Sequence, residues 1–174
     1  MTSGTSNTYQ VSFANTSPYD IDVNASYTAG PPALAEVTVL PGTGVEWVGS
    51  GQYPDALPFG ALVDGADTFS SDPVGFLVEE PDALGNFSAT DDSAYLGAEF
   101  LIDGSTYYGY IHLATAATTT GPSASFTVED WAYESDAGVG IAAGAGESPE
   151  PSTLALLALG AAVLAAFRHK QPRQ

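Results

Sequence analysis

Short runs of alternating apolar and polar residues dominate the chain from Thr8 to about Ile141. In a β-strand successive side chains point to opposite faces, so this alternation predicts strands with one buried face and one solvated face. Strict alternation in the last run places Asp130 on the same face as Val128, and Trp131 on the opposite face. No stretch before residue 150 has the period of an amphipathic helix. The alternating runs are residues 9–13, 21–25, 35–40, 45–48 and 123–132, with shorter candidates at 59–63 and 74–78.

The clearest turn signal is Asp103-Gly104, which separates alternating runs at residues 93–102 and 105–114. Asp-Gly suits the two-residue turn of a β-hairpin, because both positions of that turn require a positive φ angle. Strand-like runs also recur at a spacing of roughly ten residues, which is typical of all-β sandwiches. The sequence therefore predicts a mainly β protein, with one antiparallel β-sandwich or jelly-roll-like domain over residues 1–136.

Two changes in composition follow this domain. Residues 137–148 are rich in glycine and alanine, which predicts a flexible linker. Residues 152–167 are apolar on every side, whereas a core helix normally has a polar face. As a helix this stretch measures roughly 24 Å, a minimal span for a hydrocarbon core of ~30 Å. We therefore predict one C-terminal transmembrane helix.

Charge is divided sharply along the chain. All three basic residues lie in the last seven positions, and all 21 acidic residues lie at or before Glu150. The acidic body repels nucleic acid phosphates and anionic lipid, which argues against nucleic acid as a partner. The basic cluster should stay in the cytoplasm under the positive-inside rule, which places the acidic domain outside. The chain has no cysteine, so disulfides and thiolate metal sites are excluded.

Three parts in a fixed order make up residues 149–174. The tripeptide Pro149-Glu150-Pro151 comes first, the apolar stretch follows, and a basic cluster closes the chain. The prolines keep the helix from extending backwards, and a serine can cap its first turn. The transmembrane residues are Ser152, Leu154, Leu156, Leu157, Leu159, Val163, Leu164 and Phe167, and the basic tail residues are Arg168, Lys170 and Arg173.

This ordered signal resembles the PEP-CTERM sorting domain of Gram-negative bacteria. The resemblance implies that an exosortase, a membrane-embedded cysteine transpeptidase, recognises the tail, and that the host makes exopolysaccharide or biofilm. We therefore expect an exported protein of the cell envelope or extracellular matrix, anchored in the inner membrane before processing. The first ten residues lack the basic and apolar regions of a signal peptide. Because relatives carry such an export signal, we expect the natural start to lie upstream of Met1.

No residue pattern points to catalysis. His112 is the only histidine before the tail, and it lies inside a predicted strand. The Gly-x-Ser-x-Gly motif of a serine nucleophile does not occur, although serines and acids are plentiful enough to leave a Ser-His-Asp site open. We expect a structural or surface role for His112, and we predict that the protein is not an enzyme.

Acidic residues are the candidates for metal binding, because calcium takes about six to eight oxygen ligands. The best candidate is the loop that carries Asp64, Asp67 and Asp72, and smaller acidic groups are Asp20/Asp22 and Asp91/Asp92. A solvated acidic surface is the simpler interpretation. We therefore predict no cofactor and keep a calcium-dependent adhesion module as an alternative.

Five aromatic residues lie close together in the sequence of the last strands. Exposed aromatic rings can stack on sugar rings, but alternating positions place about half of such a set in the core. The first hypothesis is a non-enzymatic protein associated with extracellular polysaccharide, and the second is a secreted carbohydrate-binding module or hydrolase with the same tail. The aromatic set is Tyr107, Tyr108, Tyr110, Trp131 and Tyr133.

Overall fold

The structure is a computed structural model of the chain, and it describes residues 7–13, 21–28, 33–82, 84–118 and 123–147. These residues form β-strands and one short 3-10 helix, η1 (Ala145–Glu147). The prediction of a mainly β protein with antiparallel sheets is therefore confirmed. The predicted sorting signal and its transmembrane helix lie outside the described residues. Within the described residues, no helix is long and apolar enough to cross a membrane.

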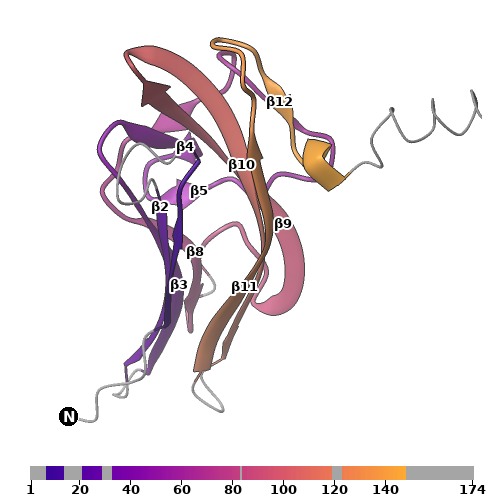
Figure 1. Cartoon of the computed structure of the whole chain (residues 1–174). Helices are drawn as coiled ribbons and strands as arrows, with labels where there is room; N and C mark the ends of the chain where they lie inside the picture. The colour runs from indigo at the N-terminus through magenta and orange to yellow at the C-terminus, as the bar shows by residue number, and fades with distance from the viewer. Residues whose placement is uncertain (1–6, 14–20, 29–32, 83, 119–122, 148–174) are drawn as a thin grey trace, which may run out of the picture.

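Two antiparallel sheets make up most of the fold and lie against each other as two layers (Figure 1). The four-stranded sheet has the order β1-β2-β3-β8, and the larger sheet has the order β11-β10-β9-β4-β5, with β7 also paired to β4. A two-stranded sheet joins β12 to β6. The bounds are β1 (Asn7–Val11), β2 (Ile21–Thr28), β3 (Leu34–Pro41), β4 (Val45–Ser50), β5 (Tyr53–Pro54), β6 (Leu62–Val63), β7 (Phe69–Ser70), β8 (Gly75–Glu80), β9 (Thr90–Ile102), β10 (Ser105–Thr118), β11 (Ser123–Tyr133) and β12 (Ile141–Ala142).

The strand order departs from the jelly-roll alternative of the prediction. Strands β1, β2 and β3 are consecutive neighbours, and so are β9, β10 and β11. Each group is a meander. Strand β8 adds to the first meander beside β3, and β4, which also pairs with β5 and β7, adds to the second beside β9. A jelly roll would instead be built from two Greek keys.

The predicted hairpin at Asp103-Gly104 is confirmed. Strands β9 and β10 pair from Ile102 and Ser105 onwards, so the turn has two residues. Asp103 has a φ angle of 51° and Gly104 one of 80°. Both values lie in the left-handed region that a type I′ turn requires, which is why this dipeptide fixes the register of the longest strand pair.

The main core, which we call the inner cluster, lies between the two layers. Alternation along the strands supplies it: every second residue is buried from Ile21 to Ala25 in β2 and from Ala35 to Val39 in β3. The six-stranded sheet contributes the opposing side chains, among them the fully buried Trp47, Leu96, Ile111 and Leu113. Side chains from both sheets thus meet in one apolar layer, as in other β-sandwiches.

A second, smaller core covers the opposite face of the six-stranded sheet, and we call it the outer cluster. Its buried residues are Val48, Val63, Tyr95, Tyr108, Tyr110, Ile141 and Ala143. Two segments without long strands cover it: residues 57–70 and the segment that follows β11. Figure 1 shows this last segment in orange, with β12 and η1 on the side of the large sheet away from β2 and β3.

The segment predicted as a flexible linker is instead part of the fold up to Glu147. We call residues 138–147 the C-terminal strap. Ile141 and Ala143 are buried, and β12 pairs with β6 in the register Ile141↔Val63 and Ala142↔Leu62. The prediction failed because glycine and alanine suit close packing of backbone against a sheet as well as they suit a linker.

Candidate functional site

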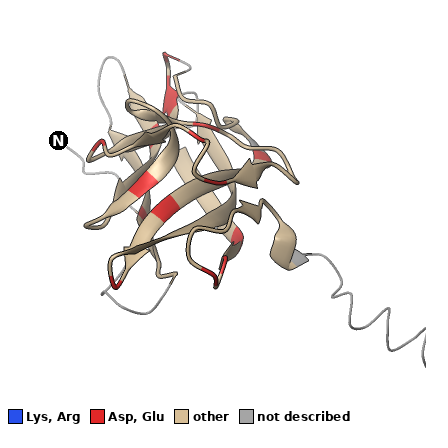
Figure 2. Cartoon of the chain, turned by 90° about the horizontal axis from the view of Figure 1, so that it is seen from above, with Lys and Arg blue, Asp and Glu red and all other residues tan. Residues whose placement is uncertain are grey.

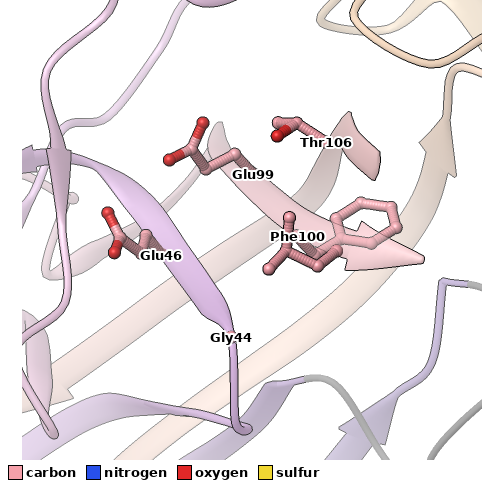
Figure 3. A pocket seen from close by; sticks show the side chains of 6 residues that line it. Gly44, Glu46, Glu99, Phe100 and Thr106 are labelled. Atoms are coloured by element: carbon pink, nitrogen blue, oxygen red, sulfur yellow. The ribbon is translucent and has the colours of Figure 1, made fainter. Parts of the chain in front are cut away.

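A pair of glutamates lies beside a cavity on the outer face of the six-stranded sheet. Glu46 in β4 and Glu99 in β9 are direct partners in the antiparallel register. Figure 3 shows both carboxylates beside the cavity, which has a volume of about 130 Å³ and is also lined by Gly44, Phe100, Leu101 and Thr106. Two like charges directly opposite each other destabilise a sheet, so this arrangement costs folding free energy unless a proton or cation is shared.

The electrostatics of this face follow from its lack of positive charge. Burial, followed by the negative charge of Glu46, raises the pKa of the Glu99 carboxyl. Tyr108 in β10 is the cross-strand partner of Glu99 on the other side of β9. Burial raises the pKa of its hydroxyl, and the negative charges of Glu99, Asp64 and Asp67 raise it further. All Lys and Arg residues lie in the last seven positions, so the described residues contain none to offset these carboxylates.

A carboxyl with a raised pKa can hold a proton at mildly acidic pH, and paired carboxylates are the chemistry of glycoside hydrolysis. The cavity is small for that task, because ligand pockets measure roughly 300–1,000 Å³. This pair was not predicted from the sequence. Alternation places Glu46 and Glu99 on a solvated face, but only the strand register brings them opposite each other.

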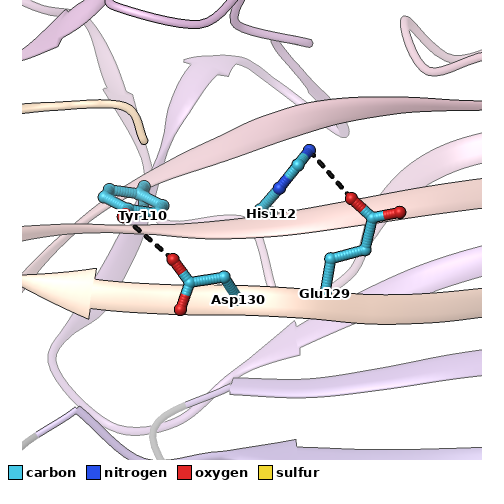
Figure 4. Close-up of polar contacts among 4 residues, drawn as sticks. All are labelled: Tyr110, His112, Glu129 and Asp130. Atoms are coloured by element: carbon cyan, nitrogen blue, oxygen red, sulfur yellow. Dashed lines mark hydrogen bonds and ion pairs between the residues drawn. The ribbon is translucent and has the colours of Figure 1, made fainter. Parts of the chain in front are cut away.

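His112 is held between an acid and an aromatic ring. Its Nε2 lies 3.1 Å from Oε2 of Glu129, and its side chain is only 12% exposed. The imidazole stacks on Tyr95 with ring centroids 4.1 Å apart and planes 12° apart. Figure 4 shows the His112–Glu129 contact running from β10 to β11. These contacts support the structural role predicted for His112.

Tyr110 links three parts of the chain through its hydroxyl. The side chain is fully buried in the outer cluster. Its hydroxyl donates a hydrogen bond of 3.2 Å to Oδ2 of Asp130 in β11 (Figure 4), and it accepts one of 3.0 Å from the backbone N–H of Gly146 in the strap. A single phenol therefore ties the end of the strap to the edge of the sheet.

The five aromatic residues do not form one surface. Tyr108 and Tyr110 are buried in the outer cluster, whereas Tyr107 and Tyr133 pack against the inner cluster. Trp131 is 37% exposed and meets Phe13 edge-on, with ring centroids 5.9 Å apart. Most of this aromatic area is therefore used for packing. Tyr107 and Tyr133 are half-buried, and Trp131 is the most exposed of the five.

The face of Trp131 corrects the strict alternation expected for β11. His112 pairs with Asp130 but Leu113 pairs with Val128, so Glu129 is an extra residue in a β-bulge. Beyond this bulge the two faces exchange. Trp131 therefore lies on the inner side like Val128, and Asp130 lies on the outer side beside Tyr110.

The predicted calcium loop uses its carboxylates to hold its own backbone. Asp64 Oδ1 accepts from the N–H of Ala66 at 2.8 Å, and Asp67 Oδ2 accepts from the N–H of Asp64 at 2.9 Å. Asp72 lies beside Ser70, whose hydroxyl reaches its Oδ2 at 3.5 Å. The described residues contain no group of three or more acids or histidines arranged to hold a metal ion. Calcium binding stays a prediction, which a melting curve with and without millimolar calcium tests.

The remaining predicted site lies in the sorting tail, outside the described residues. It comprises Pro149, Glu150 and Pro151, the apolar stretch at residues 152–167 and the basic cluster after it. Comparison with known families identifies a PEP-CTERM protein-sorting motif at residues 149–171. No curated protein and no solved structure matches the chain.

Proposed function

Because this chain carries a PEP-CTERM sorting domain, we propose that it is a non-enzymatic component of the cell envelope or extracellular matrix, associated with exopolysaccharide. The motif at residues 149–171 is the observation that carries this proposal, since it supports export and sorting by an exosortase. The chain stays in the inner membrane through residues 152–167 until the exosortase processes it. The acidic domain then acts outside the cell.

The division of charge supports this orientation. Arg168, Lys170 and Arg173 favour the cytoplasmic side of the membrane, while the domain before them has no basic residue. Figure 2 shows acidic residues on strands and loops around the described domain and no basic ones. Such a domain stays hydrated and repels anionic lipid, which suits a protein that leaves the membrane for a polymer matrix.

The processing step follows the chemistry of a cysteine transpeptidase, as the motif implies. The thiolate of the exosortase attacks a backbone carbonyl at the sorting signal, which forms a thioester with the domain and releases the tail with a free amine. An amine of an acceptor, or water, then takes the acyl group and restores the thiolate. The acidic domain ends as a conjugate or as a free secreted protein.

The experiment is expression of the full chain, with an export signal and an N-terminal tag, in an exosortase-containing host and in the same host without exosortase. We expect loss of the tail and release from the inner membrane only where exosortase is present. A variant with Pro149→Ala, Glu150→Ala and Pro151→Ala is the control, and it should keep its tail in both hosts. Identical fates of the native chain in the two hosts would contradict the proposal.

A second candidate function, polysaccharide hydrolysis, is favoured by the Glu46–Glu99 pair beside a cavity. Such a reaction needs two carboxyl groups, one of which has a raised pKa and acts as a general acid, and Glu99 has a raised pKa here. The test is release of reducing sugar from the exopolysaccharide of the host by the native domain. Activity that Glu99→Gln and Glu46→Gln each abolish would favour this function over the first.

A further inference from the structure

The sorting signal begins almost directly after the folded domain. The last residue of the strap is Glu147, and a single residue, Ser148, separates it from Pro149. A fully extended chain covers at most about 3.6 Å per residue, so the chain from Glu147 to the start of the motif can span no more than about 7 Å. A peptidase that binds an extended segment around the motif would therefore meet the domain itself.

Backbone hydrogen bonds hold the strap along its length. The N–H of Gly138 donates to the carbonyl of Thr106 at 2.9 Å, and the N–H of Ala143 donates to the carbonyl of Ala61 at 2.8 Å. The carbonyl of Ala143 in turn accepts from Gly60 at 2.9 Å. Together with the bond from Gly146 to Tyr110, these contacts fix the strap from its first residue to within three residues of the motif.

Glycines let the strap lie this close to the domain. A Cβ on Gly144 would lie 2.5 Å from ring atoms of Phe59, and a Cβ on Gly140 would lie 2.6 Å from Cβ of Asp64. The strap buries few large side chains, with Ile141 as the main one. An element with many hydrogen bonds but little buried apolar area is expected to open locally without global unfolding.

We propose that the C-terminal strap gates the processing of this protein: it must leave the six-stranded sheet before the exosortase can bind the sorting signal. This inference rests on the proposed function and adds its regulation. The rate of processing then follows the fraction of molecules in which the strap is open, provided that opening and closing are faster than cleavage. Folding of the domain thereby slows removal of its own anchor.

An engineered disulfide that holds the strap against the sheet, and that a reductant can open, tests this proposal. Leu62 and Ala142 are direct cross-strand partners, a geometry whose Cα separation of about 4.5–5.5 Å suits a disulfide. The chain has no other cysteine, so Leu62→Cys with Ala142→Cys forms one defined bridge after export to the oxidising periplasm. The single variants Leu62→Cys and Ala142→Cys are the matched controls.

We expect the locked chain to be processed at least about tenfold more slowly than either single variant in a pulse-chase experiment, and a reductant should restore the rate. Equal rates for the locked and single variants, with the native chain processed normally, would overturn the gate and leave the proposed function intact. Failure of the native chain to be processed by exosortase would instead contradict the proposed function.

Tyr110→Phe tests the gate in the opposite direction. It removes the acceptor of the Gly146 N–H and the donor to Asp130, while the ring stays in the outer cluster. We expect processing to be about fivefold faster or more, with the inner cluster still folded as judged by near-UV circular dichroism. An unchanged or slower rate in this folded variant would overturn the proposal.

Discussion

The two faces of the six-stranded sheet are covered in different ways. On the inner face a second sheet supplies alternating aliphatic side chains, and the contacts are those of one apolar residue with another. On the outer face, short strands and the strap lie over a group of tyrosines, and hydrogen bonds with close backbone contacts replace much of the apolar area. The outer face also carries the Glu46–Glu99 pair.

This difference predicts that global unfolding and local opening of the strap depend on different parts of the molecule. The inner cluster buries large side chains from both layers and therefore sets the free energy of global unfolding. The strap over the outer cluster is held mainly by backbone hydrogen bonds, close glycine contacts and the Tyr110 hydroxyl, so it should open at lower free energy. The domain is thus expected to remain folded while the part next to the sorting signal moves.

The largest expected effect comes from Ile111→Ala in the inner cluster. Ile111 is fully buried between the sheets, so its truncation leaves a cavity and should lower the free energy of global unfolding by about 2–5 kcal/mol. Urea denaturation followed by tryptophan fluorescence measures this change.

Ile141→Ala is the matched variant in the outer cluster. We expect it to reduce hydrogen-exchange protection at the backbone amides of the strap by more than it reduces global stability, because Ile141 belongs to the strap. Equal losses of global stability from the two variants would show that the two faces unfold as one cooperative unit, which would contradict separate opening of the strap.

A medium effect is expected from Gly144→Ala. Gly144 has a φ angle of 80°, and a Cβ there would collide with Phe59 at 2.5 Å. Backbone strain and the collision together should destabilise the strap by roughly 1–3 kcal/mol, measured by hydrogen exchange of its amides.

Gly138→Ala is the control within the same segment. Gly138 has a similar φ angle of 74°, but a Cβ there would meet no atom within 4 Å. Gly138→Ala should therefore destabilise the strap through backbone strain alone, by about 1 kcal/mol. If both variants lowered protection equally, close packing of the strap against Phe59 would not contribute to its stability.

The smallest effect is expected from Glu99→Gln. Because the pKa of Glu99 is raised in the folded protein, the folded state binds the proton more tightly than the unfolded state. The free energy of unfolding therefore falls as pH rises from the ordinary glutamate pKa through the raised one. Removing this charge should stabilise the protein by about 0.2–1 kcal/mol at pH 7.

The pH dependence supplies the control for this variant. The gain from Glu99→Gln should shrink as the pH is lowered through the titration of Glu99, since the native carboxyl is then protonated as well. Thermal melts at pH 7 and at pH 4 make the comparison. A gain that is equal at both values would mean that charge repulsion with Glu46 is not its source.

Local signals predicted much of the strand layout. Alternation found β2, β3 and β4, and Asp103-Gly104 located the β9–β10 hairpin, because side-chain direction and turn geometry depend on neighbouring residues. The same logic failed at Glu129. A bulge depends on how β11 registers against β10, and no residue near Glu129 announces it.

The sequence by itself determined the sorting signal at residues 149–171 and the alternating strands of the inner cluster, since both are read from contiguous residues. Only the tertiary structure decided the fate of the strap. A run of glycine and alanine is compatible with a linker or with close packing, and the partners that select packing here are Phe59, Val63 and Tyr110, far away in the sequence. Non-local contacts therefore decided how few residues separate the folded domain from the sorting signal.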